Sequence, residues 1–327
     1  MTDSENPDEA DDRLIQVKGW QVSRKRVETV RTMPRSVSQV KEYLHELGGC
    51  GYRYFLGRVV RAWSRPAAWS PQGTAVHAAA EAWERSGREL SREATRAKFT
   101  EEYAKEINLL TEETPNFDLW FSSGPYFGQA DTDRRHKKGL EQVDAYIDYY
   151  TKEAPEEVIW ITPDGEPAVE LEFNIDLDGV AMRGFIDQVV QVRPPLPDKP
   201  RTRSGAVSKS KASREEWDQR LAEWGDLPPV LRVRDIKTGA NPGDSFQLGT
   251  YAVAIELEHG AKAEFGDFWM GRLGRPTKAY ELMDRDGIAE LARKADQGIK
   301  AGVFEPNPDP DKCGRCDYRT ACDFSAA

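Results

Sequence analysis

Two strand-like runs that carry acidic residues constrain the fold of this chain more than any other feature. Asp187 lies in the β-branched run 179–192, and Asp235-Ile236-Lys237 lies in a second such run further along. Side chains alternate between the two faces of a strand, so Asp235 and Lys237 project to one side while Ile236 points away. If Asp187 faces them from a neighbouring strand, two carboxylates and one ammonium group converge at one place in a β-sheet.

These three charged side chains indicate a particular chemistry. Two carboxylates that lie close together repel each other, and a shared proton or a hard divalent cation such as Mg²⁺ or Mn²⁺ relieves the repulsion. A lysine beside such a cation can orient or deprotonate a water molecule and can stabilise the charge that develops on a phosphate. Asp187, Asp235 and Lys237 are therefore candidates for metal-assisted phosphodiester hydrolysis, although Asp-x-Lys also occurs on solvated strand faces.

The composition is that of one large acidic domain. The chain has 327 residues and a formal net charge of -10. Its first twelve residues include six acids and no base, which predicts a disordered acidic tail over residues 1–19 ahead of a single domain over residues 20–327. Net charge governs solubility, and a local basic strip can still bind phosphates. No apolar run is long enough to cross a bilayer and no signal-peptide pattern is present, so a cytoplasmic protein is expected.

The periodicity of apolar residues predicts helices followed by strands. Helices are expected from Ser36 to residue 47, from 73 past 82, and over 90–110, 134–153 and 245–258. Strands are expected at 169–175, 180–192, 230–236 and 263–273. In the first of these strands Glu170 and Glu172 alternate with apolar residues; metal ligation is one interpretation of the two carboxylates, and a solvated strand face is the favoured one.

A basic insertion rich in proline and serine separates the two strands that carry the acidic motifs. It covers residues 193–229 and, up to residue 214, has seven basic residues against the single acid Asp198. Such a composition cannot build a core and predicts a mobile arm with a short helix at 214–224. Its charge predicts contacts with phosphates. A second basic strip is expected around the arginines Arg53, Arg58, Arg61 and Arg65.

The four cysteines are divided into one distant residue and three near the C-terminus. They are Cys50, Cys313, Cys316 and Cys322, and the last three form C-x2-C-x5-C. Structural disulfides are disfavoured in a cytosolic protein, so a metal site is the first interpretation of this spacing. Four thiolates suit tetrahedral zinc or a cubane iron–sulfur cluster, and the spacing alone does not separate the two. Either group would join the start of the chain to its end.

Two further motifs accompany the acidic ones. Gln247 and Tyr251 are four residues apart in a helical stretch and so share a face, and Gly73-x-x-x-His77 opens another helical run. Together with the acidic motifs and the cysteines, these residues resemble the PD-(D/E)XK nuclease superfamily. Within it, the chain is similar over residues 36–322 to the RecB-like exonucleases with an iron–sulfur cluster, such as the fourth family of CRISPR-associated proteins and the AddB nuclease domain.

The resemblance implies a fold and a set of site residues. The expected fold is α/β, with a restriction-endonuclease-like core in which helices flank a mixed central β-sheet, an N-terminal helical region and a C-terminal iron–sulfur staple at 305–322. The implied ligands of Mg²⁺ or Mn²⁺ are His77, Asp187, Asp235 and the carbonyl of Ile236. The implied catalytic residues are Asp187, Asp235, Lys237, Gln247 and Tyr251. The implied ligands of a [4Fe–4S] cluster, favoured over zinc, are Cys50, Cys313, Cys316 and Cys322.

The activity implied by the resemblance is that of a Mg²⁺- or Mn²⁺-dependent deoxyribonuclease. It would act as an exonuclease on single-stranded or frayed DNA ends, in recombination, repair or CRISPR adaptation, with protein partners from those processes and no membrane partner. The alternative class is a non-catalytic DNA-binding or scaffold subunit of a larger nuclease complex. The intact set of Asp187, Asp235 and Lys237 argues against that alternative, because a retired site tends to lose its lysine or one carboxylate.

Overall fold

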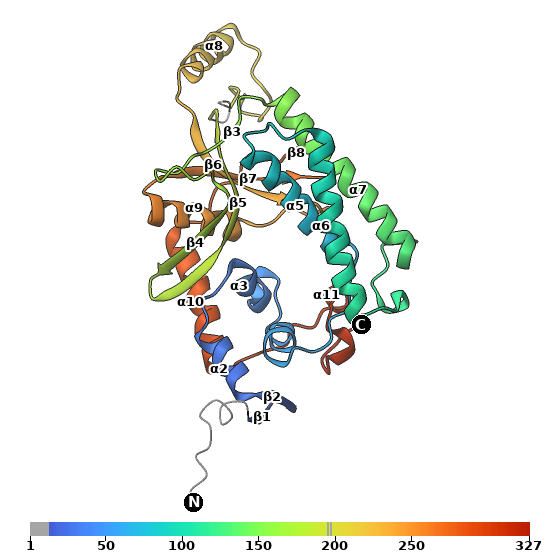
Figure 1. Cartoon of the computed structure of the whole chain (residues 1–327). Coiled ribbons are helices and arrows are strands. Elements are labelled where there is room, and N and C mark those ends of the chain that lie inside the picture. The colour runs from blue at the N-terminus through green and yellow to red at the C-terminus, as the bar shows by residue number, and fades with distance from the viewer. Residues whose placement is uncertain (1–12, 195, 197) are drawn as a thin grey trace, which may run out of the picture.

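The computed structural model describes residues 13–194, 196 and 198–327. These residues form a central β-sheet with helices on both faces, and an arm that projects from one end of the body (Figure 1). No helix in this part of the chain is long and apolar enough to cross a membrane. The predicted α/β architecture, a mixed sheet flanked by helices, is confirmed.

The predicted acidic tail lies only partly in the described structure. Residues 1–12 are outside the described residues. The end of the predicted tail forms strand β1 (Leu14–Val17), which pairs antiparallel with β2 (Trp20–Ser23). The predicted tail of residues 1–19 is therefore too long, because Ile15 and Val17 pack against the main hydrophobic core.

The central sheet is mixed. Among the described residues it has six strands in the order β3-β5-β6-β7-β8, with β4 pairing to β5 outside this path. The strands are β3 (Val158–Ile159), β4 (Val169–Leu177), β5 (Val180–Val192), β6 (Val230–Lys237), β7 (Ala263–Met270) and β8 (Arg275–Pro276). Strands β6 and β7 run parallel, and the other described pairs are antiparallel. All four predicted strands are present, and β7 ends before residue 273 because a turn with Gly274 at φ 65° follows it.

Strands β4 and β5 form a hairpin whose turn fixes which residues face each other. The turn residues Asp178 and Gly179 have φ angles of 52° and 88°, as expected for an Asp-Gly two-residue turn. The register counted from this turn aligns Glu170 with Asp187. The pairs observed on either side are Val169 with Gln188 and Leu171 with Ile186. The hairpin therefore brings a further acidic side chain next to Asp187.

Helices cover both faces of the sheet. The core on one side contains α3 (Val37–Tyr43), α9 (Ser245–His259) and α10 (Arg285–Ala301). The core on the other side contains α5 (Trp69–Arg85), α6 (Arg92–Glu113) and α7 (Gly128–Asp148). Strand β6 contributes to both, because Val233 belongs to the first core and Ile236 to the second.

Shorter helices complete the described structure. They are α2 (Arg24–Thr32), η1 (His45–Leu47), α4 (Gly51–Tyr54), η2 (Phe55–Val60), η3 (Phe117–Leu119), η4 (Tyr149–Glu153), α8 (Lys211–Gly225), α11 (Pro310–Gly314) and η5 (Arg319–Ala321). Ser36 is the N-cap of α3, as predicted, and forms a capping box with Gln39. The predicted helix ends before residue 47, because Leu44 has an extended backbone that separates α3 from η1.

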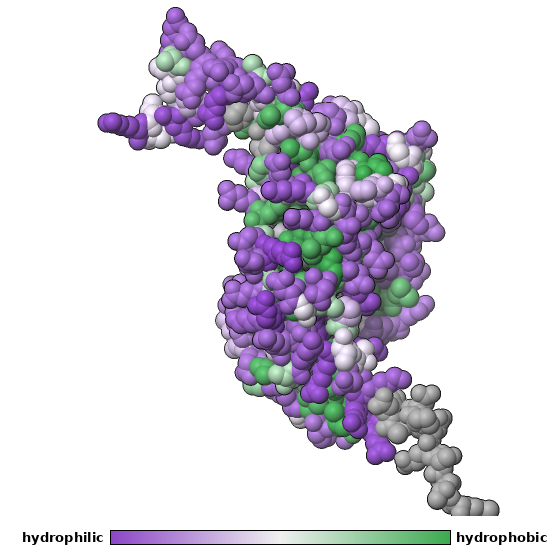
Figure 2. All heavy atoms as spheres, turned by 90° about the vertical axis from the view of Figure 1, so that its left-hand side faces the viewer, coloured by the Kyte–Doolittle hydropathy of each residue, from purple (hydrophilic) through white to green (hydrophobic). Residues whose placement is uncertain are grey.

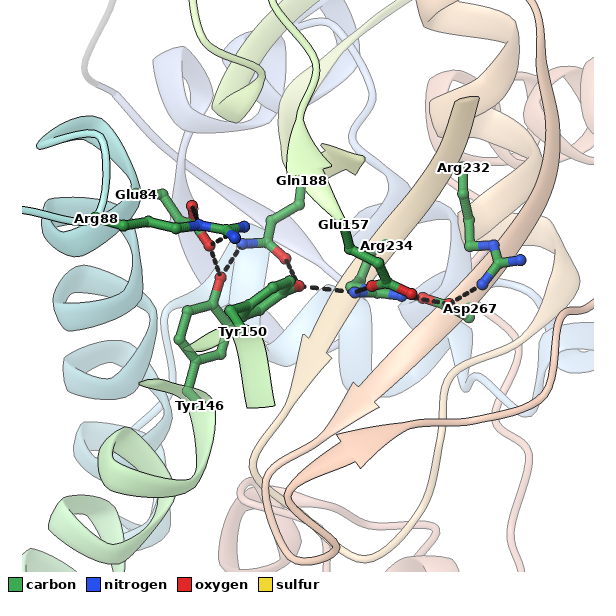
Figure 3. A network of polar contacts seen from close by, with 9 residues as sticks. All are labelled: Glu84, Arg88, Tyr146, Tyr150, Glu157, Gln188, Arg232, Arg234 and Asp267. Carbon is green, nitrogen blue, oxygen red and sulfur yellow. Dashed lines mark hydrogen bonds and ion pairs between the residues drawn. The ribbon is translucent and has the colours of Figure 1, made fainter. Parts of the chain in front are cut away.

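A buried polar network ties the sheet to the helices beside it (Figure 3). Arg234 of β6 donates to Asp267 of β7 at 2.6 and 2.8 Å and to the hydroxyl of Tyr150 at 2.7 Å. That hydroxyl donates to Gln188 of β5 at 3.3 Å, and Gln188 donates to Tyr146. Breaking a buried charged pair of this kind typically costs about 3–5 kcal/mol. Because Gln188 and Arg234 adjoin the two acidic motifs in sequence, the network holds both strands in place beside them.

The insertion forms an arm outside the body of the molecule. Figure 1 shows α8 beyond the end of the sheet, and Figure 2 shows this projection with a largely hydrophilic surface. Within the arm, the indole nitrogen of Trp224 donates to the carbonyl of Pro194 at 2.8 Å, and the Arg193 guanidinium lies 5.5 Å from the centre of the Trp224 ring. The short helix predicted at 214–224 is present as α8, which begins earlier because Ser210 caps it.

Candidate functional site

The two acidic motifs meet where strands β5 and β6 separate, at a place we call the fork. The two strands pair as far as Gln188 and Arg234 and then diverge. Asp187 and Asp235 are the next residues on each strand, so their carboxylates face each other across the opening. Both are buried, with 8% and 2% of their surface exposed. The backbone nitrogen of Ile236 donates to Asp187 Oδ2 at 2.8 Å and so links the two strands at this point.

A group of potential metal ligands lies between the fork and helix α5. One ligand atom each of His77, Glu170 and Asp187 lies within 4.8 Å of the others. His77 Nδ1 is 3.2 Å from Glu170 Oε1 and 3.5 Å from Asp187 Oδ2, and its Nε2 is 3.0 Å from the Ile236 carbonyl oxygen. Burial lowers the pKa of His77, but the carboxylates of Asp187 and Glu170 outweigh it and raise the pKa to about 9. At neutral pH the ring in this arrangement is an imidazolium whose two N–H groups face oxygen acceptors.

The donor set of this group suits a divalent cation. Three oxygens, from Glu170, Asp187 and the Ile236 carbonyl, surround the His77 ring. Oxygen ligands with one imidazole are a set that Mg²⁺ or Mn²⁺ accepts. Burial raises the pKa of Asp187, whereas the neighbouring His77 lowers it, so positive charge at this position stabilises the ionised carboxylate. A divalent ion could therefore take the place of the imidazolium as the counter-charge.

Glu170 belongs to the ligand group, although the sequence prediction favoured a solvated strand face over metal ligation for this residue. The solvated face predicted for its strand is right for Glu172, which is exposed, and wrong for Glu170, which is half-buried in the ligand group. The backbone of Glu170 has a φ of 45°, a value that is uncommon outside glycine and marks local strain. The signal was present in the Asp178-Gly179 turn, because counting back from it puts residue 170 opposite Asp187.

The other side of the fork holds the lysine. Lys237 Nζ lies 2.5 Å from Asp235 Oδ2 and 3.4 Å from Gln247 Oε1. Gln247 Nε2 donates to Asp235 Oδ1 and, at 3.0 Å, to the hydroxyl of Tyr251. Burial and the neighbouring Asp187 raise the pKa of Asp235 to about 6, against the lowering effect of Lys237. These side chains of β6 and α9 therefore form one linked polar group.

The structure divides the predicted metal ligands between these two groups. His77, Asp187 and the Ile236 carbonyl lie together, with Glu170 added. Asp235 instead contacts the lysine and the glutamine, and it is not part of the ligand group. Lys237 holds Oδ2 of Asp235 by an ion pair, and Gln247 donates to Oδ1. Both oxygens of the Asp235 carboxylate are therefore engaged on the lysine side of the fork.

The four cysteines line one cavity near the C-terminus. The cavity has a volume of about 290 Å³, and each cysteine is half-buried with a free thiol. Asn307 joins the two distant parts of the chain there, because its backbone nitrogen donates to Cys50 Sγ at 3.3 Å and its side chain donates to the Gly49 carbonyl at 2.9 Å. Among the described residues, the His77 group is the one that brings three ligand atoms within 4.8 Å of one another. The thiols are more widely spaced, and their arrangement alone does not show the predicted iron–sulfur site.

The sequence pattern of the PD-(D/E)XK nuclease superfamily matches residues 34–195 and 225–323. The chain belongs to this superfamily. The matched parts contain both sides of the fork and all four cysteines, and the unmatched stretch 196–224 is nearly the whole of the basic insertion. The predicted resemblance is confirmed at the level of the superfamily. Membership in this nuclease superfamily implies DNA as the substrate.

Two phage proteins are similar to this superfamily member along most of its length. The Gene 69 protein of Mycobacterium phage D29 is 42% identical over 298 residues, which cover 88% of this chain and 96% of the relative. The Gene 69 protein of Mycobacterium phage L5 is 41% identical over 317 residues, which cover 88% of this chain and 95% of the relative. The similarity therefore extends over the nuclease domain as a whole.

Proposed function

We propose that this protein is a Mg²⁺- or Mn²⁺-dependent deoxyribonuclease that degrades DNA from single-stranded or frayed ends. The observation that carries the proposal is the fork, where a cation-binding group and a lysine lie on either side of two facing carboxylates. Membership in the superfamily supports the class of reaction. The exonuclease character rests on the resemblance of the sequence motifs to those of RecB-like enzymes.

Each side chain of the fork has a proposed role. His77, Glu170 and Asp187, with the Ile236 carbonyl, would hold the metal ion. A bound Mg²⁺ or Mn²⁺ ion would supply Lewis-acid stabilisation of the phosphate charge and would lower the pKa of a nearby water. Lys237 would orient the attacking water and stabilise negative charge on the phosphate.

The remaining predicted catalytic residues would position this lysine. Asp235 holds Lys237 through their ion pair, and the family resemblance implies a second function for its carboxylate as a metal ligand. Gln247 fixes the Asp235 carboxylate by a hydrogen bond, and Tyr251 contacts the same amide. The pair from α9 would therefore keep the carboxylate and the ammonium aligned while DNA enters and leaves.

The phosphate-binding capacity near the fork is narrow, which favours a single strand. In the predicted basic strip, Arg53 and Arg58 share the carboxylate of Glu42. Arg65 donates to the carbonyls of Leu119 and Trp120, so its predicted place in a solvated strip is corrected to a structural one. With three of its four arginines held in this way, the strip suits one strand passing the site better than a duplex, which presents two phosphate backbones.

Linear single-stranded DNA is expected to be degraded, whereas a covalently closed circle of equal length is expected to resist. A free end must enter the fork if the protein is an exonuclease, and blunt duplex should react slowly because its ends must first unstack. A time course with Mn²⁺ on end-labelled linear and circular DNA measures both rates. Equal rates would identify an endonuclease, and tight binding without cleavage of either substrate would favour the scaffold alternative.

We further propose that the four cysteines hold a [4Fe–4S] cluster with a structural role. All four line the same cavity. Burial raises the pKa of the Cys322 thiol, and the nearby Cys50 and Cys313 raise it further, so these thiols are close enough to interact. A tetrahedral zinc site with bonds of about 2.3 Å needs sulfurs about 3.8 Å apart. The preference for a cubane cluster, which bonds each thiolate to a different iron, rests on the one-plus-three cysteine pattern of the resembled exonucleases.

Protein purified without oxygen is expected to be brown, with about four iron and four sulfide ions per chain. Cys50→Ser should lose the colour and lower the thermal midpoint together, because the cluster closes a long loop between Cys50 and the C-terminal cysteines. Asn307→Ala is the control, since it removes the side-chain hydrogen bond to the Gly49 carbonyl beside Cys50 but keeps every thiol. Absorption spectra and metal analysis decide the matter, and colourless protein with one zinc per chain would contradict the proposal.

A further inference from the structure

A second lysine lies beside Lys237 at the fork. Nζ of Lys41, on helix α3, is 3.3 Å from Gln247 Oε1, and Nζ of Lys237 is 3.4 Å from the same oxygen. Two ammonium groups around one neutral amide oxygen repel each other, and an anion that contacts both relieves the repulsion. Because both nitrogens lie within hydrogen-bonding distance of one atom, they are near enough for a single phosphate group to contact both.

Lys41 keeps donor capacity in this position. Its Nζ lies 2.8 Å from Asp244 Oδ2, and Asp244 caps helix α9 by accepting from the Gln247 backbone nitrogen at 3.0 Å. The two charged side chains are 25% and 37% exposed, and a partly hydrated ion pair adds little stability. An ammonium group has three donors, so its contacts with Asp244 and Gln247 hold Lys41 at the fork without saturating it.

The cleft in front of these lysines is lined on one side by an exposed aromatic side chain. The cleft has a volume of about 590 Å³, and its lining includes Lys41, Lys237, Gln247 and Phe185. The Phe185 side chain is 55% exposed although it lies within strand β5. It precedes Asp187 by two residues, so both side chains are on one face of the strand and about 7 Å apart along it. The Phe185 ring therefore lies near Asp187, one of the proposed metal ligands.

We propose that this cleft binds the nucleotide next to the cleaved bond, with its phosphate on Lys41 and its base stacked on Phe185. The inference rests on the proposed nuclease function, because it places the subsite beside Lys237. Stacking on an aromatic ring accepts any base, but a base presents its face only when it is unpaired and unstacked. The subsite therefore selects single-stranded DNA without selecting a sequence.

Lys41→Ala is expected to weaken binding of a fluorescent single-stranded oligonucleotide in Ca²⁺, an ion that should support binding with little cleavage. The slope of log affinity against log salt should fall by about 0.7, which corresponds to one phosphate contact on a single strand. Lys41→Arg, which keeps the charge, should restore most of the slope. An unchanged slope in Lys41→Ala would overturn the phosphate contact.

Asp244→Asn is the matched control for Lys41. It removes the ion pair but keeps the lysine and leaves a residue that caps helices well. If Lys41 served only to join α3 to α9, Asp244→Asn and Lys41→Ala would lower the thermal midpoint equally and neither would change DNA binding. That result would overturn the subsite, whereas weaker binding in Lys41→Ala alone supports it.

Phe185→Ala is expected to weaken binding of the same oligonucleotide by about 5- to 150-fold, the equivalent of stacking one base. An abasic nucleotide beside the cleaved bond should weaken binding to the unmodified protein by a similar factor. It should weaken binding to Phe185→Ala no further, because the stacking partner is already missing. An equal effect of the abasic nucleotide in both proteins would overturn the stacking.

Cleavage by the unmodified protein separates the subsite from the function on which it rests. If the unmodified protein cleaves single-stranded DNA with Mn²⁺ and both variants bind and cleave like it, the subsite alone is wrong. If the unmodified protein neither binds nor cleaves single-stranded DNA, the proposed function is wrong and the subsite falls with it. Thermal unfolding of each variant checks that the fold is retained.

Discussion

Lys237→Ala is expected to lower the turnover of single-stranded DNA by about 10²- to 10⁴-fold while metal and DNA affinity stay nearly unchanged. Lys237 Nζ is held 2.5 Å from Asp235 and 3.4 Å from Gln247, outside the His77 ligand group. Removing a group that acts mainly on the transition state lowers kcat without weakening substrate binding. Single-turnover cleavage at saturating Mn²⁺ measures the loss, and oligonucleotide binding in Ca²⁺ measures the affinity.

Lys262→Ala is a suitable control for this variant. Lys262 is exposed and directly precedes β7. Because Leu231 pairs with Ala263 at the start of the two parallel strands, Lys262 lies at the opposite end of the sheet from Lys237. Its removal changes the net charge equally and should leave turnover unchanged. Near-normal turnover in Lys237→Ala would mean that another group orients the water.

The lysine side of the fork could be predicted because its determinants are local. Alternation along a strand puts Asp235 and Lys237 on one face, and the spacing of four residues puts Gln247 and Tyr251 on one face of α9. In the structure Lys237 contacts Asp235, and Gln247 contacts both Asp235 and Tyr251. Short-range periodicity was therefore sufficient for each pair, whereas the meeting of the two pairs was implied by the family resemblance.

The metal-ligand side could be predicted only in part because it depends on strand register. His77 and Asp187 carried motifs, but Glu170 had no motif and read as a solvated strand residue. Its position opposite Asp187 is set by the hairpin register, which must be counted from the Asp178-Gly179 turn. Alternation gives the face of a side chain, whereas its partner is set by the turn.

The polar network behind the fork lay beyond sequence reasoning for a similar reason. Arg234 is fully buried in a central strand, a position that a charged residue rarely occupies without a partner. Its partners Asp267 and Tyr150 come from a different strand and a helical segment. Such a pairing follows from the packing of three separate elements, and no spacing within the sequence specifies it.

Asp187→Asn is expected to abolish detectable cleavage and to weaken Mn²⁺ binding by more than about 100-fold, since residues that merely orient metal ligands already contribute about 10- to 100-fold. Asp187 Oδ2 lies 3.5 Å from His77 Nδ1 and accepts a hydrogen bond from the Ile236 backbone at 2.8 Å. Asparagine keeps an oxygen for that hydrogen bond but removes the negative charge. Calorimetric titration with Mn²⁺ should therefore show lost binding, while thermal unfolding shows a retained fold.

Substitutions of Glu170 and Glu172 test whether Mn²⁺ binding depends on position within the fork or only on negative charge. Both lie on β4 and carry the same charge, but Glu170 belongs to the ligand group and Glu172 is exposed. If Mn²⁺ were attracted only by the general negative charge of the sheet, Glu170→Gln and Glu172→Gln would weaken its binding equally. A local site predicts a loss in Glu170→Gln, as in Asp187→Asn, and none in Glu172→Gln. Equal effects would remove the ligand group from the proposed mechanism, because only position distinguishes the two glutamates.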